Sequence, residues 1–198
     1  MAFLSARSGA RLARAAVRGC TAAWLGLVLL AAAASAAPAP PAPTEYQIKA
    51  VFLFNFAQFV EWPAAAFHEA QAPLVIGVLG DDPFGALLDE AVRGERIGGR
   101  PLVVRRYRRV DEVGECHILF ISSSEAGQID RVVARLKGRS VLTVGDTEPF
   151  NRVGGMVRFV IENKKIRLRI NVEAARAADL VISSKLLRPA MIFNPGQD

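Results

Sequence analysis

The chain has 198 residues, of which 25 are Lys or Arg, 19 are Asp or Glu and 52% are hydrophobic, and its formal charge is +6. Four of the cations, Arg7, Arg11, Arg14 and Arg18, precede Ala36, and without them the rest of the chain has 21 basic and 19 acidic residues. A nearly neutral chain lacks the concentrated basic footprint of nucleic-acid-binding proteins. The composition therefore predicts no nucleic-acid partner.

The N-terminus has the three parts of a secretory signal. The arginines of residues 1–18 are followed by an apolar run from Thr21 to Ala34 and by small residues at 34–36. A retained membrane anchor is the alternative, but the strongly hydrophobic stretch is shorter than the roughly 20 residues that span a bilayer. We predict a signal peptide at residues 1–36, cleaved near Ala36, a stiff Ala/Pro linker at 37–43 and one domain at 44–198, in the periplasm.

Helical spacing of apolar residues predicts the first element, a helix over 45–60. Its members are Ile48, Val51, Phe52, Phe56, Phe59 and Val60, and Thr44 precedes them as a cap. The apolar stripe is interpreted as packing against a sheet, with a groove for a partner protein as the alternative. Lys49 interrupts the stripe.

Four short apolar runs follow, at 74–80, 101–107, 117–122 and 140–145. Helices are predicted after the first, with Asp82 as the cap, and after the third, with Ser124 as the cap. Strands that alternate with helices indicate a parallel sheet.

The pattern then changes to two strands, 156–161 and 166–170, joined by the polar turn 162–165. Asn171 is placed to cap a further helix, and Ser183 or Ser184 a last one. The predicted fold class is α/β: a single domain with a largely parallel central sheet flanked by helices and a C-terminal antiparallel β-hairpin.

One cysteine remains after the signal, because Cys20 lies within it. An intramolecular disulfide is therefore excluded for the mature chain. Cys116 begins the apolar run CHILFI and is interpreted as a small buried hydrophobic residue, with a thiol for intermolecular pairing as the alternative.

Polar side chains follow three of the predicted strands, at 80–82, 122–124 and 145–147. Parallel strands end at one edge of a sheet, where small molecules commonly bind. The candidate ligand-binding residues are Asp81, Ser122, Ser123 and Asp146; ordinary turns and caps are the alternative. Metal binding by Asp81 and Asp82 is disfavoured, because a divalent ion needs several converging oxygens, and no cofactor is predicted.

No catalytic motif is present in the sequence. His68 and His117 have no neighbouring nucleophile motif, and there is no Gly-x-Ser-x-Gly, Walker-type loop, His-Glu-x-x-His or zinc-binding Cys pair. A hydrolase that uses Asp81 and Asp146 is the least favoured hypothesis, because acid-base chemistry needs a positioned pair. We predict that the protein is not an enzyme.

Several segments together resemble the YfiR family of periplasmic regulators: YQIKAVFLFNFAQFVEWP, VIGVLGDDPFG, CHILFIS and GGMVRFVIENKKIRLRINVEAARAADLVISSKLL. The resemblance covers nearly all of residues 45–193. It implies a protein that binds the periplasmic domain of an inner-membrane diguanylate cyclase and holds it inactive, often relieved by an outer-membrane lipoprotein. It also implies a possible small-molecule ligand, since a nucleotide and an aromatic amino acid are associated with the family.

The sequence departs from the family in its cysteines. The resemblance implies that Cys116 is a surviving half-cystine whose partner position is Gly77, so internal disulfides cannot serve as a redox sensor here.

The basic face of the hairpin is the predicted partner surface, formed by Arg158, Arg167 and Arg169 together with Arg176 on the next helix. A small-molecule binding protein that reports to another membrane sensor, such as a histidine kinase, is the alternative function. A homodimer is a further possibility.

Overall fold

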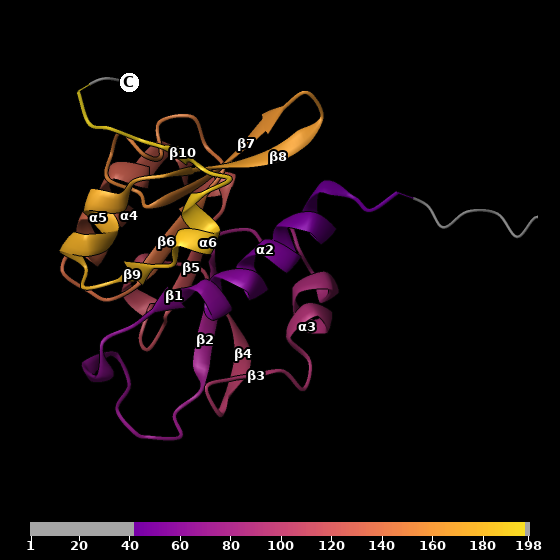
Figure 1. Ribbon diagram of the computed structural model, residues 1–198, viewed down its shortest axis with the longest axis vertical. Helices are drawn as coiled ribbons and strands as arrows, with labels where there is room; N and C mark the ends of the chain where they lie inside the picture. Colours follow the sequence, from indigo (N-terminus) through magenta and orange to yellow (C-terminus); the bar gives the residue numbers. More distant parts are fainter. Residues whose placement is uncertain (1–41, 197–198) are drawn as a thin grey trace, which may run out of the picture. The chain divides into compact units, whose positions relative to one another are not determined.

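The computed structural model describes residues 42–196, and all of them except Ala42 belong to one compact unit, Pro43–Asp198. The main sheet has eight strands in the order β10-β8-β7-β6-β5-β2-β4-β3, and Figure 1 shows helices packed against it. Most neighbouring strands are parallel, and an antiparallel hairpin lies in the C-terminal half. The predicted α/β fold class is confirmed. The predicted signal peptide lies outside the described residues, and the domain boundaries remain a prediction.

The strands of the main sheet follow the predicted apolar runs with small shifts at their ends. The parallel set is β2 (Leu74–Leu79), β4 (Arg100–Tyr107), β5 (Ile118–Ile121), β6 (Leu142–Gly145) and β7 (Val157–Glu162). The remaining strands are β8 (Lys165–Ile170), antiparallel to β7, β3 (Arg96–Ile97), antiparallel to β4, and β10 (Met191–Ile192), parallel to β8. A separate antiparallel pair is formed by β1 (Val60–Glu61) and β9 (Val181–Ile182).

Five α-helices and three short 3-10 helices connect the strands in the described part of the chain. The α-helices are α2 (Glu45–Phe59), α3 (Ala86–Val92), α4 (Ile129–Leu136), α5 (Val172–Ala177) and α6 (Ser184–Leu187). The 3-10 helices are η1 (Ala64–Ala66), η2 (Val110–Glu112) and η3 (Ser123–Gln128). Among residues 42–196, no helix has the length and apolar character needed to cross a membrane.

The two faces of the sheet carry two separate cores. Residues from α2 and α3 pack on one face with inward side chains such as Ile76 and Phe120. The other face packs Leu79 and Leu119 against α4. Alternate residues of one strand therefore serve opposite cores, which explains why the central strands are continuously apolar.

The first helix forms as predicted, and its buried face is the predicted one only in part. Thr44 and Gln47 make a reciprocal capping box. The buried residues include Lys49, Leu53 and Phe56, whereas Val51 is 52% exposed. The predicted stripe is therefore wrong at Val51, because the helix is apolar on most sides and spacing alone does not select the buried face.

Two of the predicted helix caps are wrong. Asp82 Oδ1 accepts a hydrogen bond from Phe84 N at 2.8 Å, but α3 begins only at Ala86. Ser122, not Ser124, caps the segment after β5. The predicted caps Asn171, for α5, and Ser183, for α6, are confirmed: their side chains accept hydrogen bonds from Ala174 N and Lys185 N.

The hairpin turn is tighter than predicted. Strands β7 and β8 extend to Glu162 and Lys165, which leaves Asn163 and Lys164 as a two-residue turn with φ angles of 49° and 60°. Positive φ at both positions is the backbone geometry that matches the right-handed twist of paired strands.

Cys116 is buried, as the first interpretation predicted, and is 6% exposed. Burial raises the pKa of its thiol to about 12, so the thiol is protonated at neutral pH. A Cβ atom placed on Gly77 would lie 2.8 Å from Cys116 Sγ, and equally close to side-chain atoms of Leu119 and Tyr107. Gly77 therefore faces the buried thiol across the boundary between β2 and β5.

This proximity predicts that Gly77→Cys forms a disulfide with Cys116 under oxidising conditions. The bond should stabilise the protein by about 3 kcal/mol relative to Gly77→Ala, which creates the same crowding without a bond. Urea unfolding with and without reductant measures the difference. Reductant-independent stability of Gly77→Cys would show that the two side chains do not meet.

His117 is a buried structural residue. Its Nδ1 accepts a hydrogen bond from Val75 N at 3.1 Å, so Nε2 carries the proton that faces Ala66 O at 3.2 Å. Its ring stacks on Phe67 at a centroid distance of 4.3 Å. Burial lowers the pKa of the imidazole. The neutral ring is therefore the form that fits the fold.

A pH dependence of stability follows. The unfolded state takes up a proton at His117 near pH 6.5, whereas the folded state does so only at lower pH. The free energy of unfolding should therefore be highest above about pH 6.5 and fall as the pH drops through the folded-state pKa. Urea titrations from pH 8 to pH 5 should show a steeper loss for the native protein than for His117→Gln. His68 is present in both proteins and contributes equally to their pH dependence. An equal loss of unfolding free energy with falling pH in the two proteins would therefore contradict a buried, neutral His117.

Candidate functional site

The carboxyl ends of β2, β5 and β6 lie side by side, because these strands are parallel neighbours. The structure thus brings Asp81, Ser122, Ser123 and Asp146 to one edge of the sheet, as the sequence predicts. Asp81 and Ser123 are exposed, whereas Ser122 is 4% exposed. Whether these residues bind a ligand remains a prediction.

The exits of β2 and β5 are joined to each other. Asp81 N donates to Ser124 Oγ at 3.0 Å, and Ser122 Oγ accepts from Ser124 N at 3.4 Å. Gly80 has a φ of +85°, and a Cβ atom there would overlap Ser124 and come within 3.0 Å of Glu125. The space between these two exits is therefore filled by the protein itself.

The exit of β6 is occupied by a buried cation that the sequence analysis missed. Lys49 Nζ lies 2.7 Å from Asp146 Oδ2 and 2.5 Å from Glu45 Oε1, and Lys49 is 1% exposed. The ammonium also lies over the Tyr46 ring, 4.7 Å from its centroid. Glu45 at the i−4 position was the one sequence signal that pointed to a paired lysine.

The charged form of Lys49 is the stable one. Burial acts to lower the pKa of the ammonium, but the hydrogen bonds to Asp146 and Glu45 outweigh it and hold the pKa above its usual value. A lysine whose pKa is raised stays protonated at neutral pH. The pair therefore fixes α2 to the end of β6.

The two carboxylates should contribute unequally. Asp146→Asn should lower the free energy of unfolding by about 3 kcal/mol, because it leaves a buried charge without its main partner. Glu45→Gln should cost less than about 1 kcal/mol, because the Glu45 side chain is 41% exposed and screened by water. Urea unfolding of both variants and of the native protein at pH 7 measures the two losses in the free energy of unfolding. Equal losses would contradict a dominant role for Asp146.

Asp82, one of the two adjacent carboxylates at the end of β2, is engaged in an ion pair. Asp82 Oδ2 is 2.6 Å from Arg106 Nε, and Arg106 Nη2 is 2.5 Å from Asp89 Oδ2. Hydrogen bonding to Arg106 lowers the pKa of Asp89. Across residues 42–196, no three His, Cys, Asp or Glu side chains converge as metal ligands. These ion pairs instead tie α3 to β4.

The hairpin brings three of the four predicted partner-binding arginines onto one face. Arg158 on β7 is directly opposite Arg169 on β8, and Val160 is opposite Arg167. Like charges directly opposite each other destabilise a sheet. Arg158 Nε is buried and has no hydrogen-bond partner among the described residues. Burial lowers the pKa of Arg158, and the charges of Arg169 and Arg152 act in the same direction.

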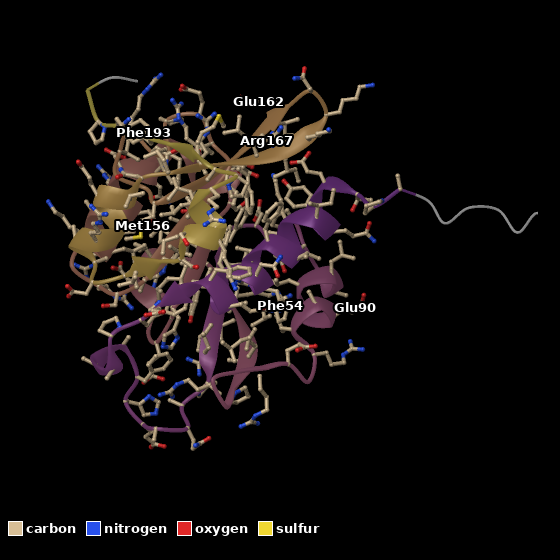
Figure 2. The ribbon with its side chains drawn as sticks, viewed as in Figure 1. Phe54, Glu90, Met156, Glu162, Arg167 and Phe193 are labelled. Atoms are coloured by element: carbon tan, nitrogen blue, oxygen red, sulfur yellow. The ribbon has the colours of Figure 1, made fainter. Side chains whose placement is uncertain are left out.

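The hairpin also presents an apolar side chain to solvent. Ile161 on β7 is 57% exposed. Figure 1 shows the tip of the hairpin projecting beyond the helices, and Figure 2 places Glu162 and Arg167 on it. The fourth predicted residue, Arg176, lies on α5, beside a small cavity also lined by Leu180, rather than on the hairpin. We call the face of β7 and β8 that carries Arg158, Arg167 and Arg169 the hairpin surface; alternation along the strands places Ile161, which pairs with Ile166, on the opposite face.

Comparisons with known proteins identify a family and a distant structural likeness. A family model described as YfiR/HmsC-like matches residues 46–191. Among curated proteins, no sequence matches the chain.

Two solved structures show the distant likeness. One is an ABC domain in complex with L-Trp from Streptococcus pneumonia, with 13% identity, a TM-score of 0.45, and 61% of this chain and 55% of that chain covered. The other is a conserved domain protein from Vibrio cholerae, with 14% identity, a TM-score of 0.47, and 61% and 54% covered. The chain therefore spans about half the length of each of these proteins.

Proposed function

Since the chain belongs to the YfiR/HmsC-like family, whose members are periplasmic regulators of diguanylate cyclases, we propose that it binds and inhibits the periplasmic domain of an inner-membrane diguanylate cyclase. In this role it lowers cyclic di-GMP signalling and transforms no substrate. An outer-membrane lipoprotein that relieves the inhibition is part of the same proposal.

The observation that carries the proposal is the hairpin surface. It gathers three arginines on one face of a projecting hairpin, where Arg158 lies directly opposite Arg169. Among the described residues, Arg167 has no carboxylate at ion-pair distance, and Arg158 Nε has no acceptor. Arginine is enriched in protein interfaces. A partner with a cluster of acidic residues complements this surface.

Binding alone does not inhibit the cyclase. The protein must bind the inactive conformation of the cyclase more tightly than the active one, because equal affinity for both leaves their populations unchanged. The projecting hairpin suits this task, since it can reach a surface that changes when the receptor switches.

Charge reversal at Arg167 and Arg169 tests the proposal. The double variant Arg167→Glu/Arg169→Glu should weaken binding to the purified periplasmic domain of the cyclase by about tenfold or more, because attraction becomes repulsion at the interface. It should also raise a cyclic di-GMP reporter in cells toward the level seen when the gene is deleted. Biolayer interferometry gives the affinity.

The matched control is Arg93→Glu/Arg131→Glu, which makes the same change of charge at exposed positions near α3 and on α4. It should retain both affinity and repression. Deletion without a rise in the reporter would contradict repression itself. Equal loss in both double variants would show that net charge, not the hairpin surface, sets the affinity.

A further inference from the structure

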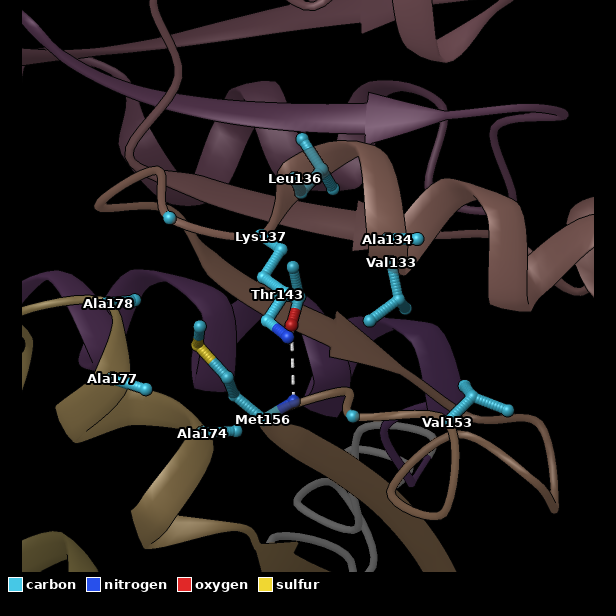
Figure 3. Close-up of a pocket in the computed structure, with 12 residues that line it drawn as sticks. Val133, Ala134, Leu136, Lys137, Thr143, Val153, Met156, Ala174, Ala177 and Ala178 are labelled. Atoms are coloured by element: carbon cyan, nitrogen blue, oxygen red, sulfur yellow. Dashed lines mark hydrogen bonds between the residues drawn. The ribbon is translucent and has the colours of Figure 1, made fainter.

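A second feature of the molecule is a cavity that none of the preceding arguments uses. It has a volume of about 440 Å³ and lies between α4 and α5, beside β6 (Figure 3). This size falls in the range of about 300–1,000 Å³ that holds small molecules. The residues that line it are Val133, Ala134, Leu136, Lys137, Gly138, Thr143, Val153, Gly154, Met156, Ala174, Ala177 and Ala178.

Small residues leave the space open. Helix α5 contributes Ala174 and Ala177, so only methyl groups reach across toward α4. On the opposite side, Gly138 and Gly154 have φ angles of +80° and +99°, a conformation that other residues rarely adopt. The cavity therefore stays open both because its lining side chains are small and because the turns at Gly138 and Gly154 favour glycine.

The walls of the cavity are aliphatic. Valine, leucine, alanine and methionine side chains dominate the lining, and aromatic residues are not among them. Thr143 Oγ1 accepts a hydrogen bond from Met156 N at 3.1 Å, so it is already engaged as an acceptor. An occupant would therefore contact mainly alkyl groups.

One cation marks the mouth of this cavity. Lys137 follows the last residue of α4, and within residues 42–196 its ammonium makes no ion pair or hydrogen bond. Figure 3 shows its side chain directed toward Thr143 and Met156 rather than away from them. The cavity therefore combines an apolar interior with a single unpaired positive charge.

We propose that this cavity binds a small amphiphilic anion, an aliphatic chain or ring that ends in a carboxylate. The alkyl part fills the space between α4 and α5, where burial of its apolar surface favours binding. The carboxylate pairs with Lys137. The site is separate from the strand exits and from the hairpin surface, and the proposal does not depend on the proposed function.

Octanoate is a suitable probe, and octylammonium is its charge-reversed counterpart. Titration of the protein labelled with ¹³C at the Met and Ala methyl groups should give saturable shifts at Met156, Ala174 and Ala177 with octanoate. Octylammonium should bind at least about fivefold more weakly, because its charge is repelled by Lys137. Equal binding of the two probes, or shifts confined to other regions, would overturn the proposal.

Two variants locate the site. Lys137→Glu should weaken octanoate binding about fivefold or more, whereas Lys164→Glu, on the hairpin turn, makes the same charge change and should leave it unchanged. Ala177→Phe should block binding by filling the cavity. Circular dichroism establishes whether Ala177→Phe is folded. If it is not folded, the octanoate affinities of Lys137→Glu and Lys164→Glu test the site. Equal effects of those two variants would refute the site.

Discussion

The buried ion pair between Lys49 and Asp146 determines much of the rest of the structure. It places a full charge between the first helix and the end of a central strand, where an unpaired charge would be strongly unfavourable. The ion pair and the packing of Phe56 on Phe159 hold α2 over the sheet together. A buried pair of this kind specifies one arrangement more than it adds stability, because desolvation offsets most of the attraction.

Other side chains of the protein also occupy the carboxyl edge of the parallel strands. In many α/β proteins this edge is the ligand crevice. Here Ser124 and Glu125 pack against Gly80, the Phe150 ring lies against Gly145, and Asp146 holds Lys49. Several polar groups at this edge therefore contact the protein itself. The exposed arginine Arg167 lies elsewhere, on the projecting hairpin.

Local chemistry explains which features could be predicted from the sequence. The hairpin and the caps at Thr44, Asn171 and Ser183 depend on residues only a few positions apart, so sequence reasoning found them. The pairing of Lys49 with Asp146 joins residues 97 positions apart. No periodicity predicts such a contact.

Two other features were beyond sequence reasoning for different reasons. The buried face of α2 is ambiguous because apolar residues occupy most of its surface. The cavity arises from what alanine and glycine leave unfilled, and the sequence shows the small residues without showing that they face one another. The grouping of Arg158, Arg167 and Arg169 was predictable because alternation along paired strands fixes which side chains share a face.

The sealed environment of Cys116 has a practical consequence for biosynthesis. Its thiol is packed among Tyr107, Leu119 and the backbone of Gly77, and no other cysteine occurs after residue 20. Folding of this unit therefore involves no choice among sulfur pairings and needs no oxidase or isomerase. The described unit therefore does not depend on oxidising conditions for its fold.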